Sequence, residues 1–162
     1  MSFAPYLTLV SEPMAVARRD FYLTDATITN PTGSNPLLDG EWLELDSNYK
    51  AVRGSGEATK PSWQVFAERG RYDTQAIQKV PLLFMHGYEA ETPIATSISG
   101  MAVGDKLVVS DVTFQSLTRR GLVKAAGGGD HLIFAWVTRI VGSGSTAKVR
   151  YWTPGAPFNF HI

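Results

Sequence analysis

The sequence predicts an all-β fold, a small β-barrel or sandwich with an extended N-terminal arm and a short C-terminal tail. Short runs of β-branched and aromatic residues recur at intervals of roughly 8 to 12 residues, and glycine or proline separates them. The one plausible helical turn, residues 74–78, is too short to be stable alone. We therefore divide the chain into an arm (1–20), a β-domain (21–152) and a tail (153–162).

Residues 1–20 alternate weakly and contain Pro5 and Pro13, which disfavours a helix and predicts an extended arm. An edge strand that pairs within its own domain is the alternative. We expect the arm to contact a partner through its apolar, aromatic and basic side chains. These are Phe3, Tyr6, Leu7, Leu9, Arg18 and Arg19.

The first half of the β-domain has the pattern of strands joined by turns. Residues 21–29 are rich in β-branched and aromatic side chains and lead into a loop of asparagine and proline, which predicts one strand. Residues 41–53 alternate on both sides of Ser47 and Asn48, which predicts a hairpin. The small, polar residues 54–61 predict an exposed connector.

Further strands are predicted wherever apolar and β-branched residues cluster again. They are residues 63–68, 80–85 and, more weakly, 94–98, followed by 103–109, 134–140 and 147–152. The triple glycine at 127–129 matches no phosphate-binding pattern and predicts a flexible hairpin loop, and residues 142–145 predict another. The tail adds Phe158 and Phe160 after two prolines, and we expect both to contact a partner.

Charge and hydropathy narrow the classes of partner. Fifteen basic residues balance fifteen acidic ones, so no net field favours nucleic acid or an anionic membrane. No apolar run approaches the roughly 18 to 20 residues that span a bilayer, and the N-terminus lacks the basic start of a secretory signal. We expect no nucleic-acid or membrane partner, and synthesis in the cytoplasm.

The residues that usually carry catalysis do not form a recognisable pattern. Cysteine is absent, no G-x-S-x-G pentad occurs, and the three histidines lie far apart. We therefore expect no enzymatic activity, no catalytic residue, no metal and no cofactor. Four carboxylates between residues 39 and 46 raise the possibility of a cation site or an acid/base pair. Period-two alternation separates them, which favours an amphipathic edge strand with one solvated face.

Four tryptophans are the other chemically distinctive side chains. Exposed on one face, they would stack on bases or sugars, but few basic residues lie between them. Core and subunit-interface positions are more typical of tryptophan. A carbohydrate-binding module remains an alternative if Trp63 or Trp152 is exposed.

The order of several short motifs resembles that of tailed-bacteriophage head decoration proteins, also called cement proteins. The motifs lie within residues 37–152, at 70–76, 79–84, 88–92, 103–109 and 136–140. The N-terminal extension and the tail depart from this pattern.

The resemblance implies a non-enzymatic virion structural protein. Such a protein binds the outer surface of a phage capsid at junctions between major capsid protein subunits, stabilises the shell, and is usually a homo-oligomer, here a dimer or trimer. Its location would be the capsid exterior. A tail or baseplate component is the alternative within the virion.

Overall fold

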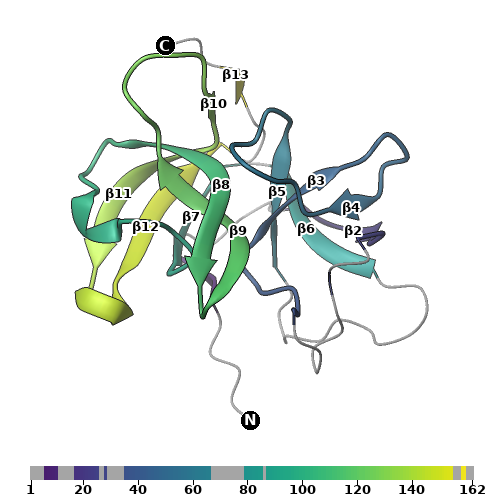
Figure 1. The fold of residues 1–162 in the computed structure, drawn as a ribbon, viewed down its shortest axis with the longest axis horizontal. Helices are drawn as coiled ribbons and strands as arrows, with labels where there is room; N and C mark the ends of the chain where they lie inside the picture. Colours follow the sequence, from purple (N-terminus) through teal and green to yellow (C-terminus); the bar gives the residue numbers. More distant parts are fainter. Residues whose placement is uncertain are drawn as a thin grey trace.

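The computed structural model describes residues 6–10, 17–25, 28, 35–66, 79–85, 87–154 and 158–159. These residues form β-strands and two short 3₁₀ turns, η1 (Ile98–Gly100) and η2 (Gly144–Thr146), which confirms the all-β class. In the part of the chain that is described, no helix is long and apolar enough to cross a membrane. Two curled sheets lie side by side as half-barrels (Figure 1).

The larger sheet has six antiparallel strands. In spatial order they are β1 (Thr8–Leu9), β7 (Tyr88–Thr92), β12 (Lys148–Thr153), β11 (Ala135–Val141), β8 (Lys106–Phe114) and β9 (Leu117–Lys124). The smaller sheet has five, β2 (Ala17–Tyr22), β6 (Lys79–Met85), β5 (Ser62–Val65), β3 (Trp42–Leu45) and β4 (Ala51–Val52). The short strands β10 (Leu132–Ile133) and β13 (Phe158–Asn159) pair with each other.

Each sheet has its own apolar cluster, and β3 contributes to both. Trp42 packs in the cluster of the larger sheet, where its ring meets Phe134 edge to face at 5.7 Å between centroids. Leu43 packs in the cluster of the smaller sheet. The predicted solvated face on this strand is therefore wrong, because β3 lies inside the sheet order and both of its faces are covered.

The described part of the N-terminal segment pairs within the two sheets. β1 forms the edge of the larger sheet through Thr8↔Glu91, and Leu7 before it is a core residue with 2% of its surface exposed. β2 forms the edge of the smaller sheet beside β6. The boundary expected at residue 20 thus falls inside β2, and the alternative of a paired edge strand describes residues 8–9 and 17–20.

Most predicted strands of the β-domain are present. The hairpin over residues 41–53 is confirmed as β3–β4, and β8, β11 and β12 occupy the last third of the chain. Residues 94–98 are not a strand, since Ala95 makes a single bridge to Leu122 before η1 begins. The predicted helical turn at 74–78 lies outside the described residues.

A tight turn closes the long β8–β9 hairpin. Gln115 and Ser116 both have positive φ, 52° and 63°, as the favoured two-residue hairpin turn requires. The Gln115 side-chain amide donates to the Tyr6 hydroxyl at 2.8 Å, and the Tyr6 ring packs edge-on against Phe114. The hairpin tip therefore holds the segment that leads into β1.

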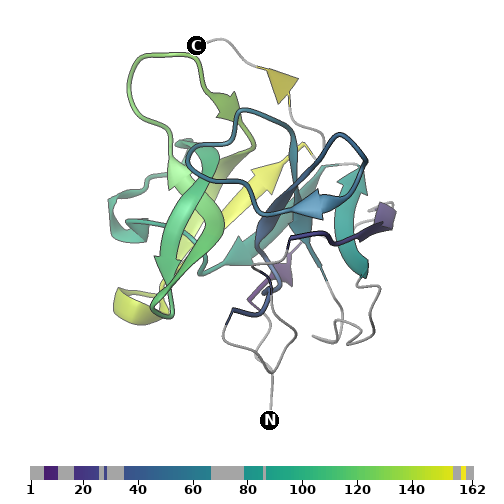
Figure 2. The same ribbon diagram turned by 45° about the vertical axis from the view of Figure 1, so that its right-hand side comes forward.

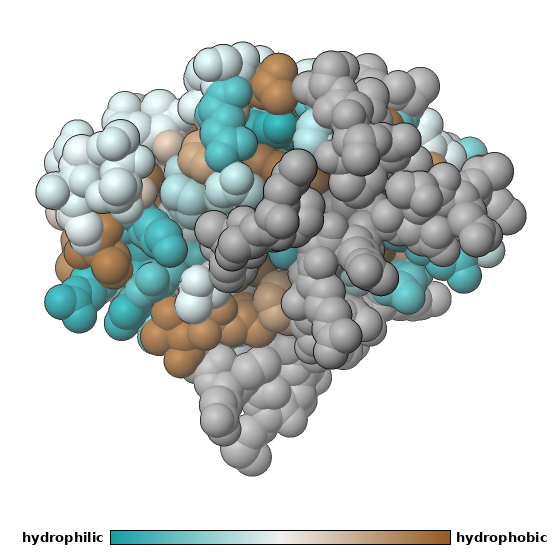
Figure 3. Space-filling view, turned by 90° about the horizontal axis from the view of Figure 1, so that it is seen from below, coloured by the Kyte–Doolittle hydropathy of each residue, from teal (hydrophilic) through white to brown (hydrophobic). Residues whose placement is uncertain are grey.

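Figure 2 shows how the two sheets curl toward each other, and Figure 3 shows apolar and polar side chains interspersed on the underside.

Candidate binding surface

Among the residues predicted to bind a partner, the structure describes the side chains of Tyr6, Leu7 and Leu9. Leu7 is buried, and Tyr6 and Leu9 are half-buried, with Leu9 packed against the core of the larger sheet. Of the others, Arg18 and Arg19 lie on β2 and Phe158 lies on β13, while Phe3 and Phe160 fall outside the described residues. Leu7 is therefore a core residue and cannot offer its side chain to a partner in this fold.

Two of the four carboxylates between residues 39 and 46, Glu41 and Glu44, belong to an ion-pair network between the sheets. Glu41 is fully buried and accepts hydrogen bonds from Arg53 at 2.9 and 3.0 Å and from Arg119 at 3.1 Å. The backbone N–H of Leu38 donates to the same carboxylate at 2.8 Å, and Arg119 also donates to the Pro36 carbonyl. Burial lowers the pKa of Arg119, an effect that Glu41 opposes.

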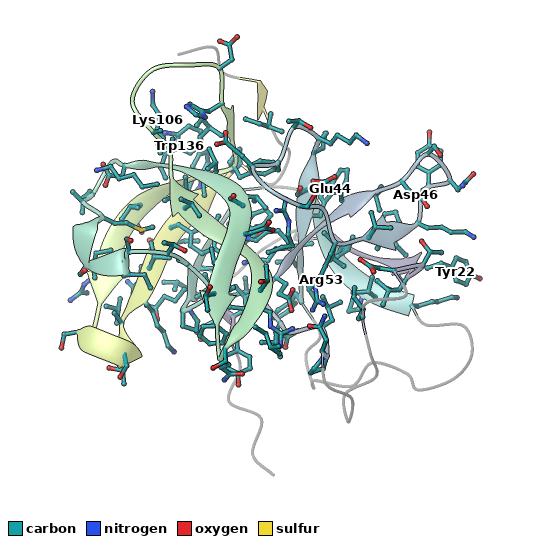
Figure 4. The ribbon with its side chains drawn as sticks, in the orientation of Figure 1. Tyr22, Glu44, Asp46, Arg53, Lys106 and Trp136 are labelled. Atoms are coloured by element: carbon teal, nitrogen blue, oxygen red, sulfur yellow. The ribbon has the colours of Figure 1, made fainter. Side chains whose placement is uncertain are left out.

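Arg120, the next residue on β9, makes a second set of contacts. It donates to Asp111 at 2.9 Å and to Glu44 at 3.4 Å, and it also donates to the Gly56 carbonyl. Gly54 makes room for this arrangement, since a Cβ there would lie 2.3 Å from a Glu44 carboxylate oxygen. Figure 4 shows Glu44 and Arg53 between the two sheets.

The chemistry of the network is structural. Three arginines meet three carboxylates, so the charges balance, and each carboxylate pairs with at least one guanidinium group. Within the described ranges, no group of three or more His, Cys, Asp or Glu side chains is placed to hold a metal ion. The network joins β3 and the connector to β9, and removing one partner from a buried ion pair typically destabilises a protein by about 3–5 kcal/mol.

The connector at 54–61 is anchored as well as exposed. The Ala58 N–H donates to the Val109 carbonyl at 2.8 Å. Glu57 lies 2.6 Å from Nδ1 of His131, which follows the triple-glycine loop. This hydrogen bond raises the pKa of His131. The pair therefore ties the connector to the glycine loop most strongly when the imidazole is protonated.

A small cavity lies between the sheets beside the Trp42 indole. Its volume is about 10 Å³, about that of a single water. The lining residues are Trp42, Ser62, Trp63, Leu83, Tyr88, Phe134 and Thr153. The Trp42 N–H is buried and has no hydrogen-bond partner among the described residues. The cavity suits one water and is too small for an organic ligand.

The outer face of the larger sheet carries a row of four side chains that we call the aromatic row. Strand register places Glu89 (β7), Trp152 (β12), Trp136 (β11) and Lys106 (β8) directly opposite one another, so they share one face. The two indole centroids are 5.6 Å apart and the rings are tilted by 39°. Trp152 is 44% exposed, Trp136 is half-buried and Lys106 is exposed. Figure 4 shows Lys106 and Trp136 together at this end of the sheet.

Neighbouring residues position the aromatic row. The Thr138 hydroxyl donates to the Glu89 carboxylate at 2.6 Å. Gly87 lies against Trp152, and a Cβ there would come within 3.3 Å of the indole. The adjacent row on the same face consists of Glu91 (β7), Arg150 (β12) and Arg139 (β11). In it Arg150 donates to Glu91 at 2.8 Å. The row thus presents an aromatic centre between a carboxylate at one end and an ammonium group at the other.

The sequence alone missed both the network and the row. The tryptophans themselves signalled a core or an interface, but the strand register decides which of them share a face. Comparisons of the chain with models of known protein families, with curated proteins and with solved structures find no match. The resemblance to decoration proteins therefore stays a prediction.

Proposed function

We propose that this chain is a non-enzymatic virion structural protein that binds the outer surface of a phage capsid at junctions between major capsid protein subunits and stabilises the shell. The observation that carries the proposal is the aromatic row, where Trp152, 44% exposed, stands beside the half-buried Trp136 on an outer sheet face and marks that face as an assembly surface. Tryptophan is enriched among the residues that dominate protein–protein binding energy. A protein that presents such a pair between opposite charges is suited to assembly.

Two further features support an assembly role. The buried arginine–carboxylate network links the two sheets, which makes the domain resistant to deformation when several neighbours bind to it. The first and last described strands, β1 and β13, have only two residues each. Such short pairings are weak, and strand segments of this kind can add to the sheet edge of a neighbour. Modest contacts suffice when a symmetric shell repeats them many times.

The test is reconstitution on particles that lack this protein. Purified chain is mixed with such particles, sedimented with them and located by cryo-electron microscopy. We expect density on the capsid exterior at subunit junctions, together with a higher temperature of shell disruption. Density confined to the tail would replace the proposal with a tail or baseplate role. Failure to sediment with any particle would refute both.

A carbohydrate-binding module is the second candidate, and the exposure of Trp152 favours it. Sugar rings stack their C–H faces on indoles, and flanking charged groups bond to hydroxyls. Titration with a panel of soluble glycans would then change the tryptophan fluorescence of the wild type and leave Trp152→Ala unaffected. That result, combined with no binding to particles, would favour this candidate over the capsid role.

A further inference from the structure

We infer that the aromatic row binds the same row of a second copy of this chain, forming a two-fold symmetric dimer. The row reads Glu89, Trp152, Trp136, Lys106 across four adjacent strands. A two-fold axis parallel to the strands, above the midpoint between β12 and β11, reverses this order. Each Glu89 then faces Lys106 of the second copy, and each Trp152 faces Trp136.

The order of charges is what favours a second copy as the occupant. An isologous interface uses one patch twice, so the patch must be complementary to its own rotated image. A carboxylate and an ammonium group at opposite ends of a row, with like residues in the middle, meet that condition. A sugar or an unrelated protein would not require the two ends to carry opposite charges.

The apolar centre of the row and the long charged side chains that flank it suit a contact between two curved sheet faces. The larger sheet curls (Figure 2), so two outer faces approach most closely along a central line, where the indoles lie. Trp152 offers the apolar surface to be buried, since it is 44% exposed. Lys106 has a side chain long enough to reach across the widening gap. The Glu89 carboxylate is held over β12 by its hydrogen bond to Thr138, and it exchanges that bond for Lys106 of the second copy when the dimer forms.

The adjacent row limits how tightly the copies bind. Arg150 stands opposite Arg139 in the register of β12 and β11, so the same axis brings arginines of the two copies toward each other. The hydrogen bond of Arg150 to Glu91 offsets part of that repulsion. We therefore expect a dimer that dissociates on dilution through the micromolar range, with the aromatic row supplying most of the affinity.

The inference rests on the proposed function in that it names a second copy of the chain as the partner of this assembly surface, and the dimer would then bind the shell through other surfaces. Its test needs no particles. Molar mass is measured by sedimentation velocity and light scattering over a concentration series for wild type, Glu89→Lys and Lys106→Glu. We expect a wild-type dimer, and dissociation constants at least tenfold higher for each variant, because each brings like charges together across the axis.

An equimolar mixture of the two variants provides the decisive measurement. Glu89→Lys has a lysine at both ends of its row and Lys106→Glu has a glutamate at both ends, so the mixture should restore a heterodimer of wild-type affinity. The double variant Glu89→Lys/Lys106→Glu should likewise dimerise. Lys60→Glu makes the same change of charge at an exposed connector position that is not part of the row; it is the matched control and should dimerise as wild type does. Circular dichroism melting checks that each variant folds.

Three results would overturn the inference. They are a wild type that stays monomeric at the highest concentration, a stable trimer, or two variants that fail to restore association when mixed. If the dimer is absent but the protein still decorates particles, only this inference falls. If the dimer forms and particles are not bound, the proposed capsid function falls instead.

Discussion

Glu41→Leu should be the most destabilising single substitution in the buried network. Glu41 accepts four hydrogen bonds, from the Leu38 N–H, from two nitrogens of Arg53 and from Arg119. Without the carboxylate, two guanidinium groups that are 8% and 2% exposed lose their counter-charge. Removing one partner of a buried ion pair costs about 3–5 kcal/mol, a large part of the roughly 5–15 kcal/mol that stabilises a typical domain.

Urea unfolding followed by tryptophan fluorescence and far-UV circular dichroism measures the change. For a chain of this length, the expected loss lowers the melting temperature by roughly 6–20 °C. Arg119→Met should lose only about 1–3 kcal/mol, because Arg53 still pairs with Glu41. The control Glu44→Gln should lose less than about 1 kcal/mol, since Arg120 keeps Asp111. If Glu41→Leu were no more destabilising than this control, the assignment of the network as the joint between the sheets would be wrong.

Four further outcomes are expected. The Gln64 side-chain oxygen accepts hydrogen bonds from the buried hydroxyls of Tyr88 and Tyr151. Gln64→Leu should therefore destabilise the fold by about 2–5 kcal/mol in the same urea assay. Burial raises the pKa of Tyr88 and of Tyr151, so in a spectrophotometric titration both should ionise only as the protein unfolds. The stability that these two groups contribute is complete below about pH 10 and declines above it. The pKa of His131 in an NMR titration should lie above 6.5 and should fall in Glu57→Gln. The stability that the pair contributes should be complete below about pH 6.5 and be lost as the pH rises through the raised pKa. An unchanged pKa in Glu57→Gln would rule the pair out. Gly121→Ala should destabilise the fold by about 1–3 kcal/mol or more, because its Cβ would lie 2.4 Å from a backbone oxygen, whereas Gly127→Ala, which meets nothing within 4 Å, should be neutral.

The parts of the fold that depend on local pattern were predictable. The hairpin over residues 41–53 follows from alternation on both sides of a polar turn, and β8, β11 and β12 follow from β-branched runs bounded by glycine. The interior position of Gly121 in β9 was not predictable. Glycine usually marks a turn, but here it admits the backbone of Ile94, which lies close only after the chain has folded.

The network and the aromatic row depend on partners that are distant in sequence. Arg119 and Glu41 are 78 positions apart, and two consecutive arginines on a strand are more typical of a solvated edge. The row depends on the β11–β12 register, which places Trp136 opposite Trp152 and shifts at a bulge after Val137. A one-residue slip would turn the Trp152 indole toward the core.

β1 leaves the ribosome long before its partner β7. Thr8 pairs with Glu91, so Leu7 stays exposed until about half of the chain has been made. Closing so long a loop slows folding, and for that time the edge of β7 is open to β1 of a neighbouring copy as well as to its own. Where many copies are synthesised together, exchange of β1 gives an intertwined pair with the same hydrogen bonds as the monomer. We therefore expect the expression level and the temperature during synthesis to influence the ratio of monomer to strand-exchanged dimer.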